Sequence, residues 1–535
     1  MAGTTLGAEL ARALKARGVE VVFGVPGVHN IELYRGLEEA GIAHVLARHE
    51  QGAGFMADGY ARASGRPGVA FVITGPGLTN IMTPMGQAWS DSVPLLVISS
   101  CLPEGEAMPG RLHQMRDQLG AGRAVCAQSH MARSAEEAFE LLDSAFAALA
   151  TGRRRPWHLS IPIDLLASPA GSAPQWARGR VEWPQAPEGA AARLAGMLEA
   201  AERPLFIFGG GAVGAAEAAR EVVRRAGAAV FTTYAGRGVV PASHPLSFGA
   251  FLARPDSAAV IARADLVVAV GTELAEVDLW REDLGREGPL VRIDIDEAVL
   301  EDTHRAEFPI RAEAGAFLAA LAPLVGESPP KWEAGEVARI RAAFRAQSAA
   351  ERPGIAEYAD ALRTVLDDGA HVYSDMTQFA YVAKEVFPME VPGHWHHPFG
   401  FGTLGYALPA AIGGKLACPE ADVVAIAGDY GFQYTLQELG VAAELGLALP
   451  LVLWDNDRLQ EIEDSMVHSQ IAPRAVRALN PDFALLARAW GLGYARAETP
   501  EAFAGALRAA LAADGPVLVH AGPGLRPLKA VSSSS

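Results

Sequence analysis

The alternation of short apolar runs with helical segments is the feature that most constrains the fold of this chain. Between residues 423 and 457, an apolar run ends at Gly428-Asp429, a helical segment follows, and a second apolar run ends at Asp455-Asn456. An apolar run, a helix and a second apolar run form a βαβ unit, whose two strands are parallel. The same alternation recurs along most of the chain and predicts an α/β protein of doubly wound parallel sheets.

The two polar strand ends of this unit predict a metal-bound diphosphate site. Asp429 and Asn456 are 456 − 429 = 27 residues apart, and the carboxyl ends of neighbouring parallel strands share the sheet edge where α/β proteins bind ligands. A carboxylate, an amide oxygen and a nearby backbone carbonyl are hard ligands that Mg²⁺ takes together with phosphate oxygens. The alternative is that both sequences are only strand-end turns, because Gly, Asp and Asn favour turns.

Breaks in the alternation divide the 535 residues into three α/β domains. We expect these domains at residues 1–170, 188–326 and 352–525, followed by a frayed tail at 526–535. A stretch rich in Pro, Gly and Ala separates the first two domains, and a charged helical connector at 331–351 leads to the third. The first and third domains share a coarse pattern of elements, which suggests an internal duplication.

The second domain contains a glycine-rich turn that fits the GxGxxG pattern of dinucleotide-binding proteins. The turn, Gly209 to Gly214, lies between a predicted strand and a predicted helix. Dinucleotide binding also needs an acidic residue at the end of the next strand, but that strand ends in Thr233-Tyr234-Ala235. NAD binding is therefore disfavoured, and tight turning with close helix packing explains the glycines better.

Composition disfavours several classes of function and location. The net charge of −17 argues against a nucleic-acid partner, which needs a basic face. Three cysteines without CxxC spacing suit a reducing, cytoplasmic location. The first residues form an amphipathic pattern without the apolar core of a signal peptide. No apolar run reaches the ~18 residues that suggest a membrane span, so we expect no membrane partner.

Six segments occur in a fixed order along the chain: GVPG at 24–27, RHEQGAGFMADGYAR at 48–62, ITGPGLTN at 73–80, DSVPLLVIS at 91–99, GTLGYALPAAIGGKLA at 402–417, and GDYG with DND at 428–457. Together they resemble thiamine diphosphate (ThDP) enzymes of the acetolactate synthase and 2-oxo acid decarboxylase type. The resemblance implies the ThDP-binding fold, with pyrimidine-binding, central Rossmann-like and diphosphate-binding domains. Within the family, GVPGVH, GRLHQ and FGTLGYAL are most similar to 5-guanidino-2-oxopentanoate decarboxylases.

The resemblance implies ThDP and Mg²⁺ as cofactors. The metal ligands would be Asp429, Asn456 and the carbonyl of Arg458. Glu50 of a partner chain would hydrogen-bond the cofactor's aminopyrimidine, which implies a homodimer or homotetramer with active sites between subunits. The alternative role of Glu50 is that of a helix N-terminal carboxylate favoured by the helix dipole. Leu404 would hold the cofactor in its bent form.

Further cofactor-binding residues follow from the same motifs. Tyr430 and Gly431 stand where the family has Gly or Ala and then Ser, and the resemblance implies that their backbone N–H groups bind phosphate despite the bulk of Tyr430. The remaining residues implied to bind the cofactor are Pro26, Pro76, Asn80, Thr377, Gln378, Thr403 and Gly428.

The implied activity is the non-oxidative decarboxylation of a 2-oxo acid, in which ThDP serves as the electron sink. His29 and His113 are the candidate proton donors, although a loop histidine is more often merely solvated. Gln114 aligns with a glutamine that the synthase branch keeps near the cofactor. Three alternatives remain open: an acetolactate synthase-type carboligase, a pyruvate oxidase-like enzyme with FAD in the central domain, which we do not expect, and a non-catalytic relative.

The segment after Asn456 is expected to border the substrate pocket with Leu459, Glu461 and Ile462, and Val28 is a further candidate substrate residue. A carboxylate in a confined pocket pairs best with a guanidinium or ammonium group through charge-assisted hydrogen bonds. Glu461 therefore predicts a 2-oxo acid with a cationic tail. The alternative is that the acidic residues here form a solvated helix face.

Overall fold

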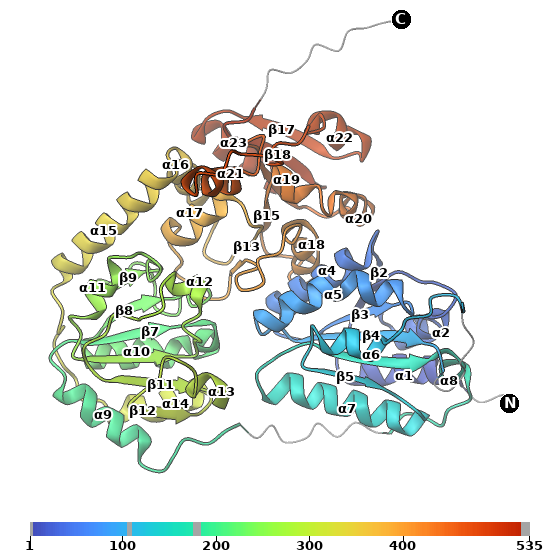
Figure 1. Cartoon of the computed structure of the whole chain (residues 1–535), viewed down its shortest axis with the longest axis horizontal. Helices are drawn as coiled ribbons and strands as arrows, with labels where there is room; N and C mark the ends of the chain where they lie inside the picture. Colours follow the sequence, from blue (N-terminus) through green and yellow to red (C-terminus); the bar gives the residue numbers. More distant parts are fainter. Residues whose placement is uncertain (1–3, 104–109, 175–182, 526–535) are drawn as a thin grey trace, which may run out of the picture.

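Three parallel sheets form three lobes of the molecule (Figure 1). The computed structural model describes residues 4–103, 110–174 and 183–525, so the predicted tail at 526–535 lies outside the described residues. The N-terminal lobe is blue to cyan, the central lobe is green, and the C-terminal lobe, in orange and red, lies above the other two in this view.

The N-terminal sheet has six parallel strands in the order β2-β1-β3-β4-β6-β5. Its strands are β1 (Val21–Gly24), β2 (Ala43–Leu46), β3 (Gly68–Val72), β4 (Leu95–Cys101), β5 (Gln128–Met131) and β6 (Trp157–Pro162). Its helices are α1 (Leu6–Ala16), α2 (Ile31–Tyr34), α3 (Leu37–Ala40), α4 (Glu50–Ser64), α5 (Pro76–Ser90), α6 (Gln118–Arg123), α7 (Ala135–Thr151) and α8 (Ile163–Ala167).

The central sheet has the order β12-β11-β10-β7-β8-β9. Numbered within the lobe, this is the 3-2-1-4-5-6 order of the Rossmann fold, as predicted. Its strands are β7 (Pro204–Phe208), β8 (Ala229–Thr232), β9 (Ser247–Gly249), β10 (Leu266–Val270), β11 (Leu290–Asp294) and β12 (Phe308–Arg311). Its helices, with η for 3₁₀, are α9 (Ala190–Ala200), η1 (Gly210–Ala215), α10 (Ala216–Ala226), α11 (Ser257–Ile261), α12 (Glu276–Leu279), α13 (Glu297–Leu300), α14 (Ala314–Leu321) and η2 (Ala322–Leu324).

The C-terminal sheet, β14-β13-β15-β16-β18-β17, repeats the topology of the N-terminal sheet, which supports the suggested duplication. Helix α15 (Ala334–Glu351) leads to it from the central lobe. Its strands are β13 (His371–Ser374), β14 (Trp395–His396), β15 (Val423–Gly428), β16 (Pro450–Trp454), β17 (Gly493–Ala497) and β18 (Val517–Ala521). Its helices are α16 (Ile355–Arg363), α17 (Gln378–Val386), α18 (Ala407–Ala417), α19 (Asp429–Phe432), η3 (Leu436–Glu438), α20 (Leu439–Glu444), α21 (Gln460–His468), α22 (Phe483–Ala489) and α23 (Pro500–Leu511).

Continuous apolar strands explain why helices cover both faces of each sheet. Every residue of β3, β10, β15 and β16 is buried, so neither face can lie against water. Turn and cap residues then end the elements: the helix α4, for example, stops at Gly65, whose φ of +67° favours glycine.

The N-terminal and C-terminal lobes share one hydrophobic core, which fixes their relative position. Phe55 and Met56 of α4 belong to the same buried cluster as Tyr406 and Ile412 beside and within α18. The helices α4 and α18 cross with their backbones in close approach, because a Cβ atom at Gly59 would lie 1.9 Å from the carbonyl oxygen of Ala410. The C-terminal lobe also shares a core with the central lobe.

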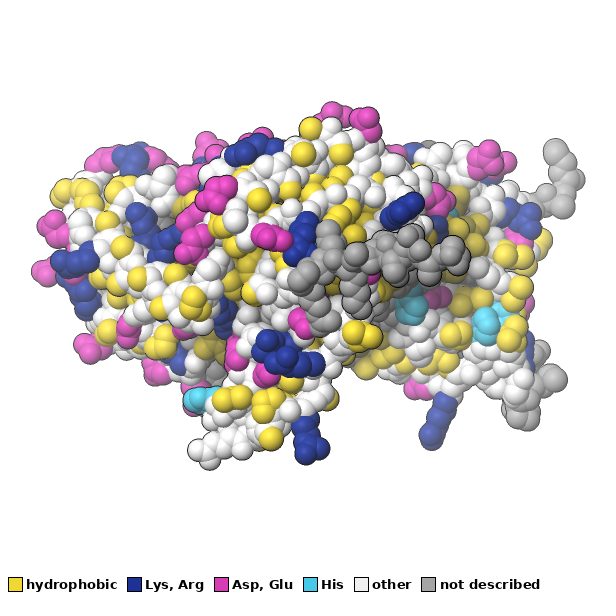
Figure 2. All heavy atoms as spheres, turned by 90° about the horizontal axis from the view of Figure 1, so that it is seen from above, with side chains coloured by type: hydrophobic (Ala, Val, Ile, Leu, Met, Phe, Trp, Pro, Cys, Tyr) yellow, Lys and Arg dark blue, Asp and Glu magenta, His cyan; other side chains and the backbone are white. Residues whose placement is uncertain are grey.

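The surface carries both signs of charge. On the face seen in Figure 2, acidic and basic side chains are interspersed. Among the residues that the structure describes, no helix has both the length and the apolar character needed to cross a membrane.

Candidate active site

The three predicted metal ligands come together at the carboxyl ends of β15 and β16. The two strands are paired in parallel, with Gly428 opposite Trp454, so Asp429 and Asn456 follow neighbouring strand ends. One atom of the Asn456 side-chain amide lies 3.1 Å from Asp429 Oδ1 and 2.6 Å from the carbonyl oxygen of Arg458. The strand-end argument therefore places these groups correctly.

This group of oxygens suits a hard cation. With the Asn456 amide oxygen turned inward, three oxygen atoms converge, which is the type of ligand that Mg²⁺ takes; with the nitrogen inward, the same contacts are two hydrogen bonds. Asp429 is only 3% exposed, and burial raises the pKa of its carboxyl to about 6. Within the described ranges, no group of three His, Cys, Asp or Glu side chains could hold a metal, so the mixed oxygen set is the candidate.

Two amide side chains hold Asp429 in place, and sequence reasoning did not assign either. Asn480 Nδ2 donates to Asp429 Oδ2 at 2.6 Å. Gln433 Nε2 in turn donates to Asn480 Oδ1 and to the Asp429 carbonyl, both at 3.0 Å. Asn480 lies 51 residues from Asp429, and nothing in that spacing signals the contact.

Four of the predicted cofactor-binding residues surround the same sheet edge. A Cβ atom at Gly428 would lie 3.1 Å from Thr377 Oγ1, and one at Gly431 would lie 3.2 Å from Leu404 Cδ2. At both positions a side chain would crowd a neighbouring residue, and glycine leaves that space free. The ring of Tyr430 packs edge-to-face on Tyr434, at 5.8 Å between centroids.

Asp375 is a further residue of this edge that was not predicted. It follows β13 directly and is 1% exposed. Its carboxylate accepts hydrogen bonds from Met376 N at 2.9 Å and Gly405 N at 2.8 Å, and burial raises its pKa to about 6. Asp375 thereby fixes Gly405, whose φ is +82°, and with it the neighbouring Leu404. Its strand-end position was the signal that could have identified it. Thr403, before Leu404, donates from Oγ1 to the Leu404 carbonyl at 3.2 Å.

In the N-terminal lobe, three other predicted residues lie on two adjacent helix starts. Glu50 is the first residue of α4, and His49 caps that helix by accepting from Gln51 N at 3.1 Å. Pro76 opens α5, and Asn80 on the same helix donates to Glu50 Oε2 at 2.9 Å. Pro26 lies two residues after the end of β1 and is exposed.

The two candidate proton donors form a pair. The rings of His29 and His113 have centroids 4.9 Å apart, and the Nδ1 atom of each is buried without a hydrogen-bond partner in the described chain. Burial, followed by the nearby His113 and Arg111, lowers the pKa of His29. Gln114, next to His113, accepts at its Oε1 from Gly110 N at 3.0 Å and from Arg111 N at 3.3 Å.

Glu461 is not the free carboxylate that the sequence predicts. Arg352 binds it with two nitrogens, Nε at 3.2 Å and Nη2 at 2.7 Å, and Gln378 Nε2 donates to it at 3.3 Å. Because Gln378 follows Thr377, this contact places Glu461 beside the candidate cofactor edge. The other predicted substrate residues are partly solvent-facing: Val28 is 68% and Ile462 48% exposed, while Leu459 N bonds to the Val476 carbonyl at 2.8 Å.

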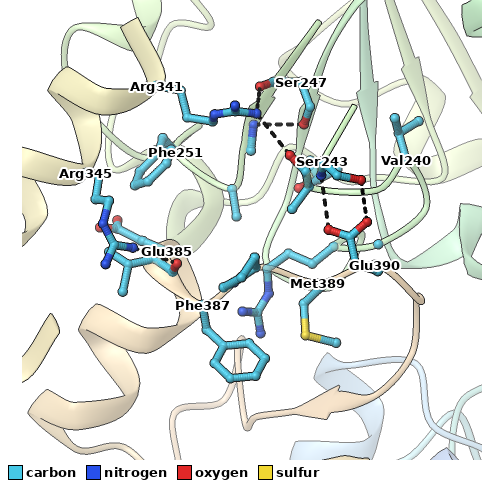
Figure 3. A pocket seen from close by; sticks show the side chains of 18 of the residues that line it. Val240, Ser243, Ser247, Phe251, Arg341, Arg345, Glu385, Phe387, Met389 and Glu390 are labelled. Atoms are coloured by element: carbon cyan, nitrogen blue, oxygen red, sulfur yellow. Dashed lines mark hydrogen bonds between the residues drawn. The ribbon is translucent and has the colours of Figure 1, made fainter. Parts of the chain in front are cut away.

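A cavity of about 620 Å³ lies elsewhere, between the central and C-terminal lobes (Figure 3). On its wall, Arg345 Nη2 donates to both carboxylate oxygens of Asp360, at 2.6 and 2.7 Å. Across the cavity, Ser243 donates to Glu390 at 2.6 Å, and Arg341 donates to the Ser247 carbonyl at 3.0 Å. None of the predicted site residues lines this cavity.

The glycine-rich turn of the central lobe serves packing, as the sequence favoured. Gly211 N donates to the Gly271 carbonyl at 3.0 Å, and a Cβ atom at Gly209 would lie 2.3 Å from that oxygen. The turn between β7 and α10 is thus pressed against the end of β10.

Three family descriptions match the chain, one for each lobe. They are "Thiamine pyrophosphate enzyme, N-terminal TPP binding domain" at residues 4–121, the central domain of the same enzymes at 191–321, and their C-terminal TPP binding domain at 375–521.

Curated relatives match along nearly the whole chain. The chain is 44% identical over 530 residues to the probable 2-ketoarginine decarboxylase AruI of Pseudomonas aeruginosa, covering 96% of this chain and 93% of that protein. It is 32% identical over 527 residues to the acetolactate synthase isozyme 2 large subunit of Escherichia coli, covering 96% and 94%. The isozyme 3 large subunit of the same organism is 31% identical over 517 residues, covering 91% and 88%.

Proposed function

This chain belongs to the thiamine pyrophosphate enzyme family, whose cofactor is the compound called ThDP above. On that premise we propose that it catalyses the ThDP- and Mg²⁺-dependent, non-oxidative decarboxylation of a 2-oxo acid. The observation that carries the proposal is the convergence of Asp429, Asn456 and the Arg458 carbonyl on paired strand ends. That edge lies in the lobe that matches the C-terminal TPP binding domain.

Each residue at the edge has a physical task in this proposal. Asp429, Asn456 and the Arg458 carbonyl hold Mg²⁺, and the open backbone at Gly428 and Gly431 receives the diphosphate. Bound ThDP supplies the electron sink that accepts the electron pair left by CO₂. Asn480 keeps the Asp429 carboxylate oriented toward the metal.

At the aminopyrimidine end of the cofactor, Glu50 takes part in proton transfer. Its carboxylate, oriented by Asn80 Nδ2, shares a proton with the aminopyrimidine and so helps the cofactor to lose one. His29 and His113 supply the proton that replaces the departing CO₂, since their unpartnered Nδ1 atoms leave capacity for exchange. We further propose that Glu50 acts across a homodimer or homotetramer interface.

We propose 2-ketoarginine, which is 5-guanidino-2-oxopentanoate, as the substrate. Support comes from the 44% identity to the probable 2-ketoarginine decarboxylase and from Glu461 beside the cofactor edge. A second candidate is an acetolactate synthase-type carboligase, favoured by identities near 30% to those synthases. An FAD enzyme has less support, because the central glycine turn is packed against Gly271.

The test is a panel of 2-oxo acids assayed for CO₂ release with ThDP and Mg²⁺. We expect 2-ketoarginine to exceed pyruvate and 2-oxohexanoate in kcat/KM by tenfold or more, roughly the value of one buried charge-assisted pair, and to yield an aldehyde. Acetolactate formed from pyruvate as the main product would favour the carboligase.

The matched variants are Glu50→Gln and Glu39→Gln. Of these two residues, only Glu50 is proposed to contact the cofactor, so Glu50→Gln is expected to lower kcat by about a hundredfold or more. Glu39 is an exposed partner of Arg12, so Glu39→Gln is expected to leave kcat unchanged. CO₂ release that needs no ThDP, or that survives Glu50→Gln, would contradict the proposal.

A further inference from the structure

Glu438 is a fully buried carboxylate that has no role in the proposal above. It ends the short helix η3 of the C-terminal lobe, and its side chain is 0% exposed. Burial raises its pKa to about 7, against the opposing effect of the backbone N–H groups of Arg48 and His49. Burying a carboxylate is unfavourable unless hydrogen bonds replace water, so its position calls for an explanation.

The hydrogen-bond donors to this carboxylate come from the N-terminal lobe. Arg48 N donates to Glu438 Oε1 at 3.2 Å and to Oε2 at 3.1 Å. Arg48 and His49 are the two residues immediately before Glu50, and His49 is the cap of α4. The carboxylate therefore holds the main chain at the point where Glu50 begins its helix.

The sequence leaves room for this carboxylate on α4. A Cβ atom at Gly52 would lie 2.2 Å from Glu438 Oε1, so any side chain at that position would push the two apart. Glycine inside a helix lowers the stability of the helix by ~1 kcal/mol relative to alanine. The close approach of Glu438 explains why position 52 is nevertheless a glycine.

The other end of the same segment is tied to the cofactor edge. Glu438 N donates to the Thr435 carbonyl at 3.0 Å, and Thr435 Oγ1 donates to the Gly405 carbonyl at 2.8 Å. Asp375 binds Gly405 N, beside Leu404. A continuous series of hydrogen bonds thus runs from the loop of Leu404 to the main chain before Glu50.

We infer that Glu438 is a positioning residue: it holds the backbone of Glu50 where that carboxylate can act on the cofactor, while Asn80 orients the side chain. This inference rests on the proposed role of Glu50. It assigns the C-terminal lobe a task beyond binding the cofactor, namely to fix the starting point of α4.

The test compares Glu438→Gln with the parent enzyme. Glutamine keeps the shape but turns an NH₂ group toward one of the two N–H donors, so Glu50 is displaced slightly. We expect kcat to fall about tenfold, since small misplacements of a catalytic group are costly, while the affinity for ThDP, followed by tryptophan fluorescence, changes less than about twofold. Hydrogen exchange of the amides at 48–50 should become faster.

Two further variants keep the test decisive. Glu444→Gln is the matched control, because Glu444 binds the exposed side chain of the same Arg48, and it should leave kcat and exchange unchanged. Gly52→Ala displaces Glu438 from the other side, so it should reproduce the kinetic effect even if Glu438→Gln does not fold.

Three outcomes would overturn the inference. Unchanged kcat and amide exchange in Glu438→Gln or Gly52→Ala would show that the carboxylate does not position Glu50. Equal losses of ThDP affinity and kcat would show a general structural role. Full turnover in Glu50→Gln would contradict the proposed function itself. That result is distinguishable from failure of the inference, because the inference is tested in Glu438→Gln and Gly52→Ala.

Discussion

At the scale of single residues, Glu461 shows how an intramolecular partner changes the meaning of a predicted site residue. The sequence predicts a carboxylate free to bind a cationic substrate, whereas the structure pairs it with the guanidinium of Arg352. That guanidinium is the same chemical group as the tail of 2-ketoarginine. Glu461 is thus able to bind such a group with two hydrogen bonds, and Arg352 occupies that position in the chain alone.

Replacing Glu461 with alanine tests this residue. If Glu461 recognises the substrate tail, the ratio of kcat/KM for 2-ketoarginine over 2-oxohexanoate should fall by about tenfold or more, since a hydrogen bond to a charged group contributes about 1.5–3 kcal/mol. Asp464→Asn on the same helix is the control, because Asp464 accepts a hydrogen bond from Gln460 Nε2 at 2.7 Å on the exposed side of the helix. An unchanged ratio would mean that Glu461 serves only to hold Arg352.

At the scale of elements, the crossing of α4 and α18 joins the two lobes that carry the candidate site. A Cβ atom at Gly413 would lie 1.9 Å from the Met56 carbonyl, which mirrors the contact of Gly59 with Ala410. Backbone atoms cannot move aside as a side chain can. The two glycines therefore set the distance between the helices, and through it the position of Glu50 at the start of α4.

Alanine substitutions at this crossing should be destabilising although alanine favours helices. We expect Gly59→Ala and Gly413→Ala each to lower the free energy of unfolding by about 1–3 kcal/mol, because overpacking forces the helices apart. Gly196→Ala in α9 is the control: a Cβ atom there would meet no described atom within 4 Å apart from its own helix backbone, so alanine should stabilise by about 0.5–1 kcal/mol. Urea unfolding measures all three, and equal effects would refute the crossing argument.

At the scale of the whole molecule, the C-terminal lobe shares a core with each of the other two, so the three lobes act as one body within a chain. The N-terminal and C-terminal sheets have the same strand order, and each contributes one half of the proposed machinery: Glu50 from one and the metal ligands from the other. We propose that each active site combines Glu50 of one chain with the metal ligands of another chain.

Mixed dimers of two inactive variants test that arrangement. One chain carries Glu50→Gln and the other Asp429→Asn, and two affinity tags isolate the mixed species. If each site combines Glu50 of one chain with Asp429 of the other, one site of the two is fully intact, so we expect about half of the parent activity. If each site lies within one chain, the mixed dimer should be as inactive as either variant.

The fold and the proximity of the proposed metal ligands were predictable because they follow from local patterns. Apolar runs define the strands, and the parallel arrangement brings Asp429 and Asn456 together at neighbouring strand ends. The partners of site residues were not predictable. Arg352 lies 109 residues from Glu461, and Glu438 lies 390 residues from Arg48, so only the packing of whole lobes determines that they meet.

The half-turn available to the amide of Asn456 has a consequence for the order of assembly. With its nitrogen turned inward, this amide would donate two hydrogen bonds, to Asp429 and to the Arg458 carbonyl, and repulsion between three clustered oxygens would be avoided. Loading then requires the amide to swing round, which gives up those bonds at a penalty of about 1–3 kcal/mol. If the site binds magnesium as proposed, a newly made polypeptide can fold first and acquire the cation and the vitamin-derived coenzyme afterwards.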